Sequence, residues 1–275
     1  MLMISPADVA ADPFPHVIKQ DILPQALFAQ LKADFPRAQE FEAQRSVNGA
    51  SGSRTGTGFD FYRGDASYVD LTTRSAAWKE FDAFVNSERF ADTFREVFAA
   101  YIDDIGLRID VMQSRVQPNY FEPRNSLTEL ATPADRVKTL GLNVVDLFQK
   151  PKPVQLFTRL DIHKSLGGYA KPPHCDRPNR LCSLIIYFTD AENAGLEGGD
   201  LLIFKHNQDK PVKNYERHPR AQDVTQIAKL RPQENLGVFF PCQNNSYHGV
   251  TAVTSRGVER DFLYINISGR TASLW

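Results

Sequence analysis

The pattern of the chain changes near Val154, and this change limits the folds that the sequence can form. Short apolar runs separated by turn clusters follow this residue, and no long helical pattern interrupts them. The runs are VQLFTRLDIH, LCSLIIYF, DLLIF, GVFF and DFLYINIS. Several short strands of this kind indicate an antiparallel sandwich or jelly roll, because a parallel α/β sheet would need a helix between consecutive strands.

The N-terminal half has a different pattern, in which apolar residues recur at helical spacing. Residues 21–35 show it after a helix-start signal, and Pro36 ends it. Residues 75–101 repeat it with aromatic stripes, which we interpret as core rather than as ligand contacts. A short helix fits residues 134–140, within a stretch otherwise broken by prolines. Together with the β region, these patterns predict an α+β chain.

The composition is that of an ordinary globular protein, with 42% hydrophobic and 24% charged residues. Lys and Arg (32) nearly balance Asp and Glu (33), so we expect no bulk attraction to nucleic acid or to an anionic membrane. The opening lacks the features of a secretory signal, and the apolar stretches are too short to span a bilayer. Cys175, Cys182 and Cys242 match no zinc-type CxxC spacing, which favours a reducing cytoplasm. The oligomeric state has no signal in the sequence.

A histidine and a carboxylate, His174 and Asp176, stand two residues apart in the β region. On a strand both would point to one face while Cys175 points to the other. His248 follows the strand-like run GVFFP. Two imidazoles and one carboxylate on one face of an octahedral metal form the facial triad of non-haem iron(II) oxygenases. The HxD motif alone is weak evidence, because a surface His-Asp pair would explain it equally well.

The HxD motif is part of a longer pattern. A strand-like run follows it, a Gly-Gly-acidic hairpin comes next, and a glycine-led run leads to the distal histidine and then to a basic residue. The positions are His174, Asp176, Gly198, Gly199, Asp200, His248 and Arg260. Over about residues 154–270 this order resembles the core of the prolyl-hydroxylase-like members of the Fe(II)/2-oxoglutarate-dependent oxygenase superfamily. The segment PFPHVIKQDILPQALFAQLKADFP also resembles a common opening of that superfamily.

The resemblance implies a double-stranded β-helix, or jelly roll, with N-terminal helices packed on its major sheet. It implies one domain over residues 1–275, in which residues 1–153 are mainly helical and loop support and residues 154–270 form the catalytic core. The implied enzyme is a dioxygenase that hydroxylates a C–H bond of a small molecule or of a peptide or protein side chain, releasing succinate and CO2. Fe(II), 2-oxoglutarate and O2 are the expected cofactors, with ascorbate as a candidate reductant. Desaturation or ring closure would use the same ligands, and the substrate does not follow from the sequence.

In this family the basic residue pairs with the distal carboxylate of 2-oxoglutarate, a task that suits the guanidinium fork. Two arginines follow the distal histidine. Arg256 falls in a turn, whereas Arg260 begins a strand-like run that has aromatic and polar residues on one face and aliphatic residues on the other. We therefore predict Arg260 as the anchor and Tyr187 as a second contact. A core tyrosine with a backbone partner would explain Tyr187 equally well.

Several further residues are candidate substrate contacts. Residues 46–58 are rich in Gly and Ser, so they form either a plain flexible connection or a lid over the site. Arg159 shares a strand face with Asp161 and His163, which would line a pocket or form an ion cluster. Arg177 and Arg180 follow the metal-binding turn and would meet an anionic substrate or remain solvated. The candidates for substrate binding are Arg54, Phe59, Arg159, Tyr169 and Arg177.

Two other classes of function fit parts of the pattern. A cupin-like binding module would use the same jelly roll without catalysis, since a widely reused fold does not determine activity. A zinc hydrolase would use the same three ligands, because zinc also accepts two histidines and a carboxylate. Arg260 argues against both, because neither needs an anchor for 2-oxoglutarate. Asp176 favours hydroxylation over halogenation, because the related halogenases lack the metal-binding carboxylate.

Overall fold

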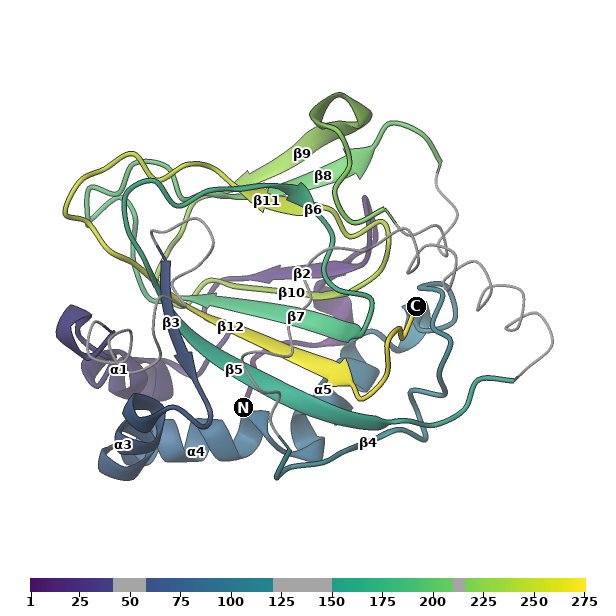
Figure 1. The fold of residues 1–275 in the computed structure, drawn as a ribbon, viewed down its shortest axis with the longest axis horizontal. Coiled ribbons are helices and arrows are strands. Elements are labelled where there is room, and N and C mark those ends of the chain that lie inside the picture. Colours follow the sequence, from purple (N-terminus) through teal and green to yellow (C-terminus); the bar gives the residue numbers. More distant parts are fainter. Residues whose placement is uncertain (42–57, 121–149, 210–215) are drawn as a thin grey trace.

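The computed structural model of the chain describes residues 1–41, 58–120, 150–209 and 216–275. Two antiparallel sheets face each other, and helices cover the outer face of the larger one (Figure 1). The strands are β1 (Val9–Ala10), β2 (His16–Lys19), β3 (Gly58–Tyr62), β4 (Arg115–Val116), β5 (Gln155–Ser165), β6 (Lys171–His174), β7 (Arg180–Tyr187), β8 (Leu201–His206), β9 (Val224–Leu230), β10 (Gly237–Pro241), β11 (His248–Val250) and β12 (Arg260–Gly269). The α-helices are α1 (Gln25–Ala33), α3 (Ala66–Arg74), α4 (Ala76–Val85) and α5 (Glu88–Val97), with short 3-10 turns η1 (Pro6–Asp8), η2 (Ala99–Tyr101) and η4 (Ala221–Asp223).

The topology is that of a double-stranded β-helix, which confirms the fold predicted from the sequence. The larger sheet has the order β1-β2-β10-β7-β12-β5-β3, with β4 pairing alongside β5, and the smaller sheet has the order β6-β11-β8-β9. The N-terminal half is less purely helical than its periodicity indicates, because it also supplies strands to the larger sheet. β2 pairs with β10, and β3 pairs with β5. Their pairing partners lie far along the chain, so no local pattern identifies these strands.

The alternation predicted for the last strand holds over most of β12. Arg260, Phe262 and Tyr264 lie opposite Ser165, His163 and Asp161 of β5 in the strand register, and so share the face that looks toward the smaller sheet. From residue 263 onward, the residues on the opposite face are aliphatic and fully buried: Leu263, Ile265 and Ile267. One face of the larger sheet therefore carries the helices, and the other forms a polar and aromatic wall.

The aromatic stripes of the helices are core, as predicted. In α4, Ser75 caps the first turn by accepting a bond from the Trp78 backbone N–H, and the Trp78 indole donates to the Leu31 carbonyl at 3.1 Å. The aromatic residues of α5 and the residue after it pack on the outer face of β10. The ring centres of Phe90, Phe94 and Phe98 lie 5.2–6.2 Å from that of Phe239. This apolar layer holds the larger sheet from outside and leaves its inner face for the site.

In the described part of the chain, no helix combines the length and apolar character that crossing a membrane requires.

Candidate active site

Three buried side chains converge between the two sheets. His174, Asp176 and His248 place their ligand atoms within 4.8 Å of one another. His174 ends β6 and His248 begins β11, and the two residues face each other in the strand register. Asp176 reaches them from the turn between β6 and β7. Two imidazoles and a carboxylate at this spacing suit a divalent transition metal with open coordination positions.

The strand geometry expected for the HxD motif is only partly correct. β6 ends at His174, so Asp176 lies beyond the strand and is not positioned by strand alternation. The turn is tied down instead by the Cys175 backbone N–H, which donates to the Arg217 carbonyl at 2.9 Å. The side chains converge because the turn brings the carboxylate back toward the pair of histidines.

Both imidazoles are held with one nitrogen directed to the metal position. Nδ1 of His174 bonds to the Pro172 carbonyl at 2.9 Å, and Nδ1 of His248 bonds to the Ser246 carbonyl at 3.0 Å. A carbonyl only accepts, so each Nδ1 carries the proton and each Nε2 keeps its lone pair for a ligand bond. Burial lowers the pKa of both histidines, that of His174 further because of His248 beside it, so the rings stay neutral as metal ligands must.

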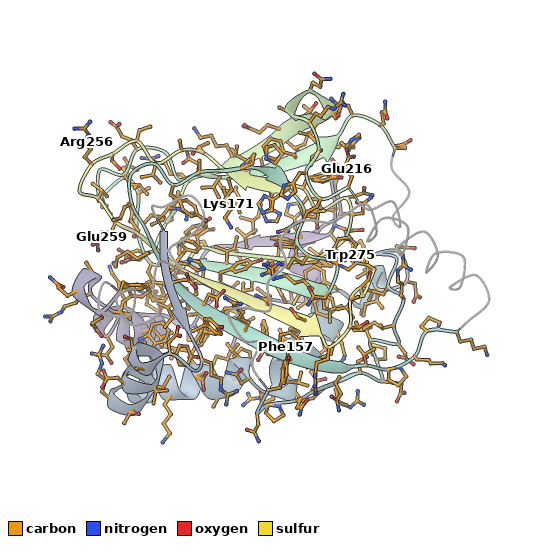
Figure 2. All side chains as sticks on the ribbon, in the orientation of Figure 1. Phe157, Lys171, Glu216, Arg256, Glu259 and Trp275 are labelled. Atoms are coloured by element: carbon orange, nitrogen blue, oxygen red, sulfur yellow. The ribbon has the colours of Figure 1, made fainter. Side chains whose placement is uncertain are left out.

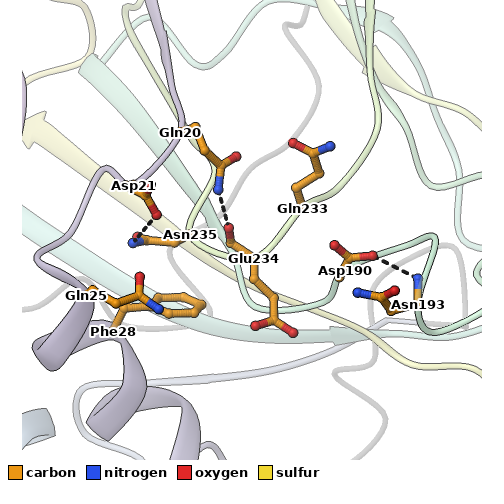
Figure 3. Close-up of a pocket in the computed structure, with 9 residues that line it drawn as sticks. All are labelled: Gln20, Asp21, Gln25, Phe28, Asp190, Asn193, Gln233, Glu234 and Asn235. Carbon is orange, nitrogen blue, oxygen red and sulfur yellow. Dashed lines mark hydrogen bonds between the residues drawn. The ribbon is translucent and has the colours of Figure 1, made fainter.

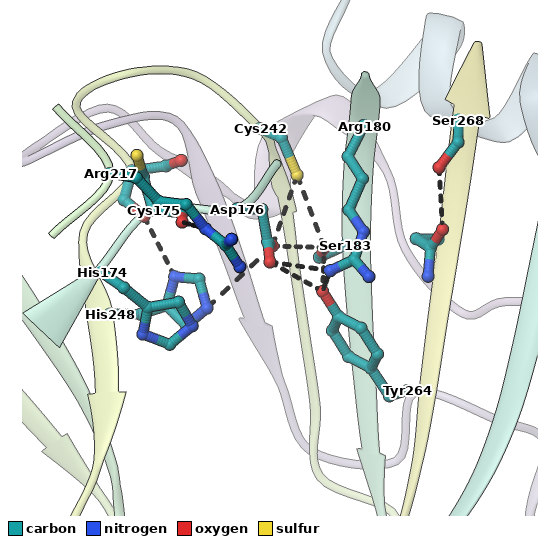
Figure 4. Close-up of polar contacts among 12 residues, drawn as sticks. His174, Cys175, Asp176, Arg180, Ser183, Arg217, Cys242, His248, Tyr264 and Ser268 are labelled. Atoms are coloured by element: carbon teal, nitrogen blue, oxygen red, sulfur yellow. Dashed lines mark hydrogen bonds and ion pairs between the residues drawn. The ribbon is translucent and has the colours of Figure 1, made fainter. Parts of the chain in front are cut away.

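The carboxylate of Asp176 is embedded in donors that the sequence analysis did not identify (Figure 4). Ser183 and Tyr264 donate their hydroxyls to it at 2.7 and 2.9 Å, and Arg180 Nη1 donates at 2.8 Å. Burial alone would raise the pKa of Asp176, but the charge of Arg180 and the hydrogen bond from Ser183 oppose this effect, and the pKa is held well below its usual range. The group is therefore an ionised, fixed ligand. Tyr264 could have been suspected, because it shares the strand face of Arg260.

Arg260 is buried on the same wall, with only 1% of its surface exposed. Its Nη2 donates to the Tyr187 hydroxyl at 3.2 Å, and its guanidinium lies 4.3 Å from the Phe262 ring centre. Within the described residues, Nε and Nη1 have no hydrogen-bond partner. A buried cation with unmet donors is costly unless a ligand supplies the acceptors. The arrangement fits a dicarboxylate that reaches from the metal position to this guanidinium.

The Gly-Gly-acidic hairpin has a steric role beside Arg260. A Cβ on Gly199 would lie 2.8 Å from Arg260 Cδ, and one on Gly198 would lie 1.8 Å from the Ala252 carbonyl oxygen. Asp200 then ties the hairpin to β9 through Lys229 at 3.2 Å. The two glycines therefore let the loop pack directly on the arginine and on the chain that leads to it.

Gly199→Ala should displace Arg260 and raise the KM for 2-oxoglutarate by roughly tenfold, because an ionic hydrogen bond of about 1.5 kcal/mol would be lost. Gly257→Ala is a matched control. Both glycines have a φ of +73°, so alanine strains both backbones alike, but a Cβ on Gly257 meets no atom within 4 Å. Steady-state kinetics on both variants checks this. An equal change of KM in the two variants would assign the effect to strain and not to the arginine.

The structure places the other predicted residues as follows. Tyr169 is buried, 5.9 Å from the Arg260 guanidinium, and Arg159 is buried with its Nε donating to Asp161 at 2.6 Å. Arg177 is partly exposed in the turn after Asp176, and Arg256 projects from the exposed loop before β12 (Figure 2). The predicted lid covers residues 46–58, of which only Gly58, at the start of β3, is described. Arg54, the side chain of Phe59 and the helix over residues 134–140 lie outside the described residues.

A hollow on the surface lies away from these residues (Figure 3). It has a volume of about 400 Å³ and lies beside the start of α1. None of its lining residues belongs to the triad: Gln20, Asp21, Gln25, Phe28, Asp190, Asn193, Gln233, Glu234 and Asn235. It carries no part of the chemistry described above.

Comparison with known families decides what the triad belongs to. Residues 160–267 match the model of the 2OG-Fe(II) oxygenase superfamily, and this span includes the triad and Arg260. Over these residues the chain is similar to the 2OG-Fe(II) oxygenase superfamily. Fe(II) and 2-oxoglutarate follow from the family and the triad, and the donor set and the unmet Arg260 nitrogens fit both.

Solved structures of other 2-oxoglutarate oxygenases are similar to this one. A prolyl-4-hydroxylase of Pseudomonas putida is 13% identical with a TM-score of 0.45, covering 93% of each chain. A prolyl 4-hydroxylase of Phytophthora capsici is 15% identical with a TM-score of 0.45; the match covers 94% of this chain and only 60% of that one. A prolyl hydroxylase of Trichoplax adhaerens, solved with a hypoxia inducible factor peptide, is 10% identical with a TM-score of 0.42, covering 92% and 83%. The search of curated proteins found no match.

Proposed function

We propose that this oxygenase hydroxylates an unactivated C–H bond of a small molecule or of a peptide side chain, converting 2-oxoglutarate and O2 to succinate and CO2. His174, Asp176 and His248 hold the iron, and Arg260 with Tyr187 holds the far carboxylate of 2-oxoglutarate. The observation that carries the proposal is the buried guanidinium of Arg260, whose Nε and Nη1 lack partners among the described residues. Bound iron and 2-oxoglutarate supply the activation of dioxygen.

The protein's own contribution is positioning, charge and exclusion of water. Ser183, Tyr264 and Arg180 fix the carboxylate of Asp176 and keep it ionised, so the ligand does not rotate away from the metal. Phe262 and Phe240 line the same space, Phe240 with its ring centre 5.0 Å from that of His248. These rings keep water from the co-substrate, which strengthens the bond to the guanidinium.

The two alternative functions account for fewer of the observed residues of the site. A cupin-like binding module or a zinc hydrolase would account for the three ligands but not for a buried arginine with unmet donors on the same wall. We also propose a single domain over residues 1–275. Strands β1, β2 and β3 support this, because they extend the same sheet as the core strands β5, β7, β10 and β12.

The test is conversion of 2-oxoglutarate with Fe(II) in air, measured as succinate, against pooled metabolites and short peptides. We expect succinate release that depends on iron and rises when a pool contains the substrate, and we expect mass spectrometry to show a product heavier by one oxygen atom. The Zn(II)-loaded protein is the control. Hydrolysis by that form, without succinate from the iron form, would favour the hydrolase instead.

A further inference from the structure

A second arginine, Arg180, contacts the metal-binding carboxylate itself. Its Nη1 donates to Asp176 at 2.8 Å and also to the Tyr264 hydroxyl. Its guanidinium lies 5.0 Å from the centre of the Tyr264 ring, which restricts the orientation of the group. The side chain is only 14% exposed. Arg180 is therefore a fixed cation beside the metal position.

One edge of this guanidinium is unused. Among the described residues, the side-chain hydrogen bonds of Arg180 all come from Nη1, so Nε and Nη2 offer two parallel N–H groups. This is the edge that binds a carboxylate through two bonds. Next to Tyr264 on the same face of β12, the buried amide nitrogen of Asn266 also lacks a partner among the described residues, while its oxygen accepts from Ser268 at 3.0 Å (Figure 4). Two sets of unmet donors thus lie on one wall.

Arg180 and the metal position share one carboxylate, that of Asp176, which pairs with Arg180 Nη1 at 2.8 Å. Two positive charges of iron and one negative charge of Asp176 leave one positive charge, and 2-oxoglutarate with Arg260 offsets it. Asp176 is then shared between the metal and Arg180, and the Nε–Nη2 edge of Arg180 is left for a second anion. Arg159 does not have this role, because it is paired with Asp161 at 2.6 Å and lies 4.0 Å from Asp60. An anionic group of the substrate would fit the Nε–Nη2 edge of Arg180.

We propose that the substrate carries a carboxylate, bound by the Nε–Nη2 edge of Arg180 with the Asn266 amide beside it. The inference rests on the proposed function and names the substrate class for that site. Because Arg180 touches a ligand of the metal, the oxidised carbon lies only a few bonds from the carboxylate. Free amino acids and short organic acids fit this geometry, and so does an acidic side chain or C-terminus of a peptide.

A binding experiment can measure the contribution of the substrate carboxylate apart from that of the rest of the substrate. The probes are amino acids and short organic acids, each paired with its carboxamide, and peptides that end in the same acids. Calorimetry is done on the protein loaded with Fe(II) and 2-oxoglutarate, with O2 excluded. We expect at least one acid to bind about tenfold more tightly than its amide, since a charged hydrogen bond is lost in the amide. Tighter binding by peptides than by free acids would identify a peptide as the source. No preference for any acid would overturn the inference.

Variants separate substrate binding from support of the metal ligand. Arg180→Gln keeps a donor for Asp176 but loses the charged edge, so we expect the KM for the acid to rise about tenfold or more. The KM for 2-oxoglutarate should not change, and any loss of iron affinity, from the altered contact with Asp176, should be smaller than the loss of affinity for the acid. Arg180→Lys should restore part of the affinity, and Arg220→Gln, at an exposed arginine, is the control. An equal loss of iron affinity would make Arg180 only a positioning residue, and a raised KM for 2-oxoglutarate would make it a cofactor contact. Absence of succinate with every probe would instead count against the proposed function.

Discussion

Alanine at His248 should abolish iron-dependent succinate release while the chain remains folded. His248 is one of the three candidate ligands found among the described residues. Changing a residue that only supports a ligand lowers metal affinity by roughly 10–100-fold, so we expect a loss of at least about 100-fold when a ligand itself is removed. Equilibrium binding of Fe(II), or of Co(II) as a stable substitute, gives the affinity directly. The thermal midpoint of the metal-free protein reports whether the fold survives.

His16→Ala is the matched control for His248→Ala. His16 is also buried, at 6% exposure against 5% for His248, and its Nδ1 also bonds to a carbonyl, that of Phe14 at 2.8 Å. It lies on β2 of the larger sheet and outside the triad. Loss of a buried imidazole is therefore common to both variants, while loss of a metal ligand is not. Near-normal turnover in His248→Ala would show that the three residues of the triad are not together the ligands of the catalytic metal.

Changing Arg260 should weaken the binding of 2-oxoglutarate without lowering the stability of the fold. Arg260→Ala removes an ionic hydrogen bond worth about 1.5–3 kcal/mol, so the KM for 2-oxoglutarate should rise by roughly 10-fold to 150-fold. Arg256→Ala, at the exposed arginine of the preceding loop, should leave the KM unchanged. The reverse pattern would place the anchor at Arg256.

Arg260→Met adds a test that does not depend on turnover. Methionine fills much of the same volume without the charge, and replacing a buried charge by an apolar side chain is often neutral or stabilising. We expect the thermal midpoint without 2-oxoglutarate to be equal to or above that of the wild type. The increase in midpoint on adding 2-oxoglutarate should disappear. A retained increase would show that another residue holds the co-substrate.

The sequence predicts those parts of the site that follow from local periodicity. Alternation along residues 260–267 is sufficient to assign Arg260 to the inner face of its strand, and the two histidines lie on strands that meet. The residues around Asp176 could not be predicted in this way. Ser183 and Tyr264 reach it only because β7 and β12 are adjacent and in one register, and that register is set by the whole sheet. For the same reason the sequence does not predict β2, because β2 pairs with β10, more than two hundred residues away along the chain.

The metal ligands are divided between the two sheets. His174 and His248 belong to β6 and β11 of the smaller sheet, whereas Asp176 is held by Ser183 and Tyr264 on β7 and β12 of the larger one. An ion held by all three residues would therefore connect the smaller sheet to the strands of the larger sheet that hold Asp176. Since an ion that binds only the native state stabilises it in proportion to the logarithm of its concentration, the free energy of unfolding should rise with the Fe(II) concentration.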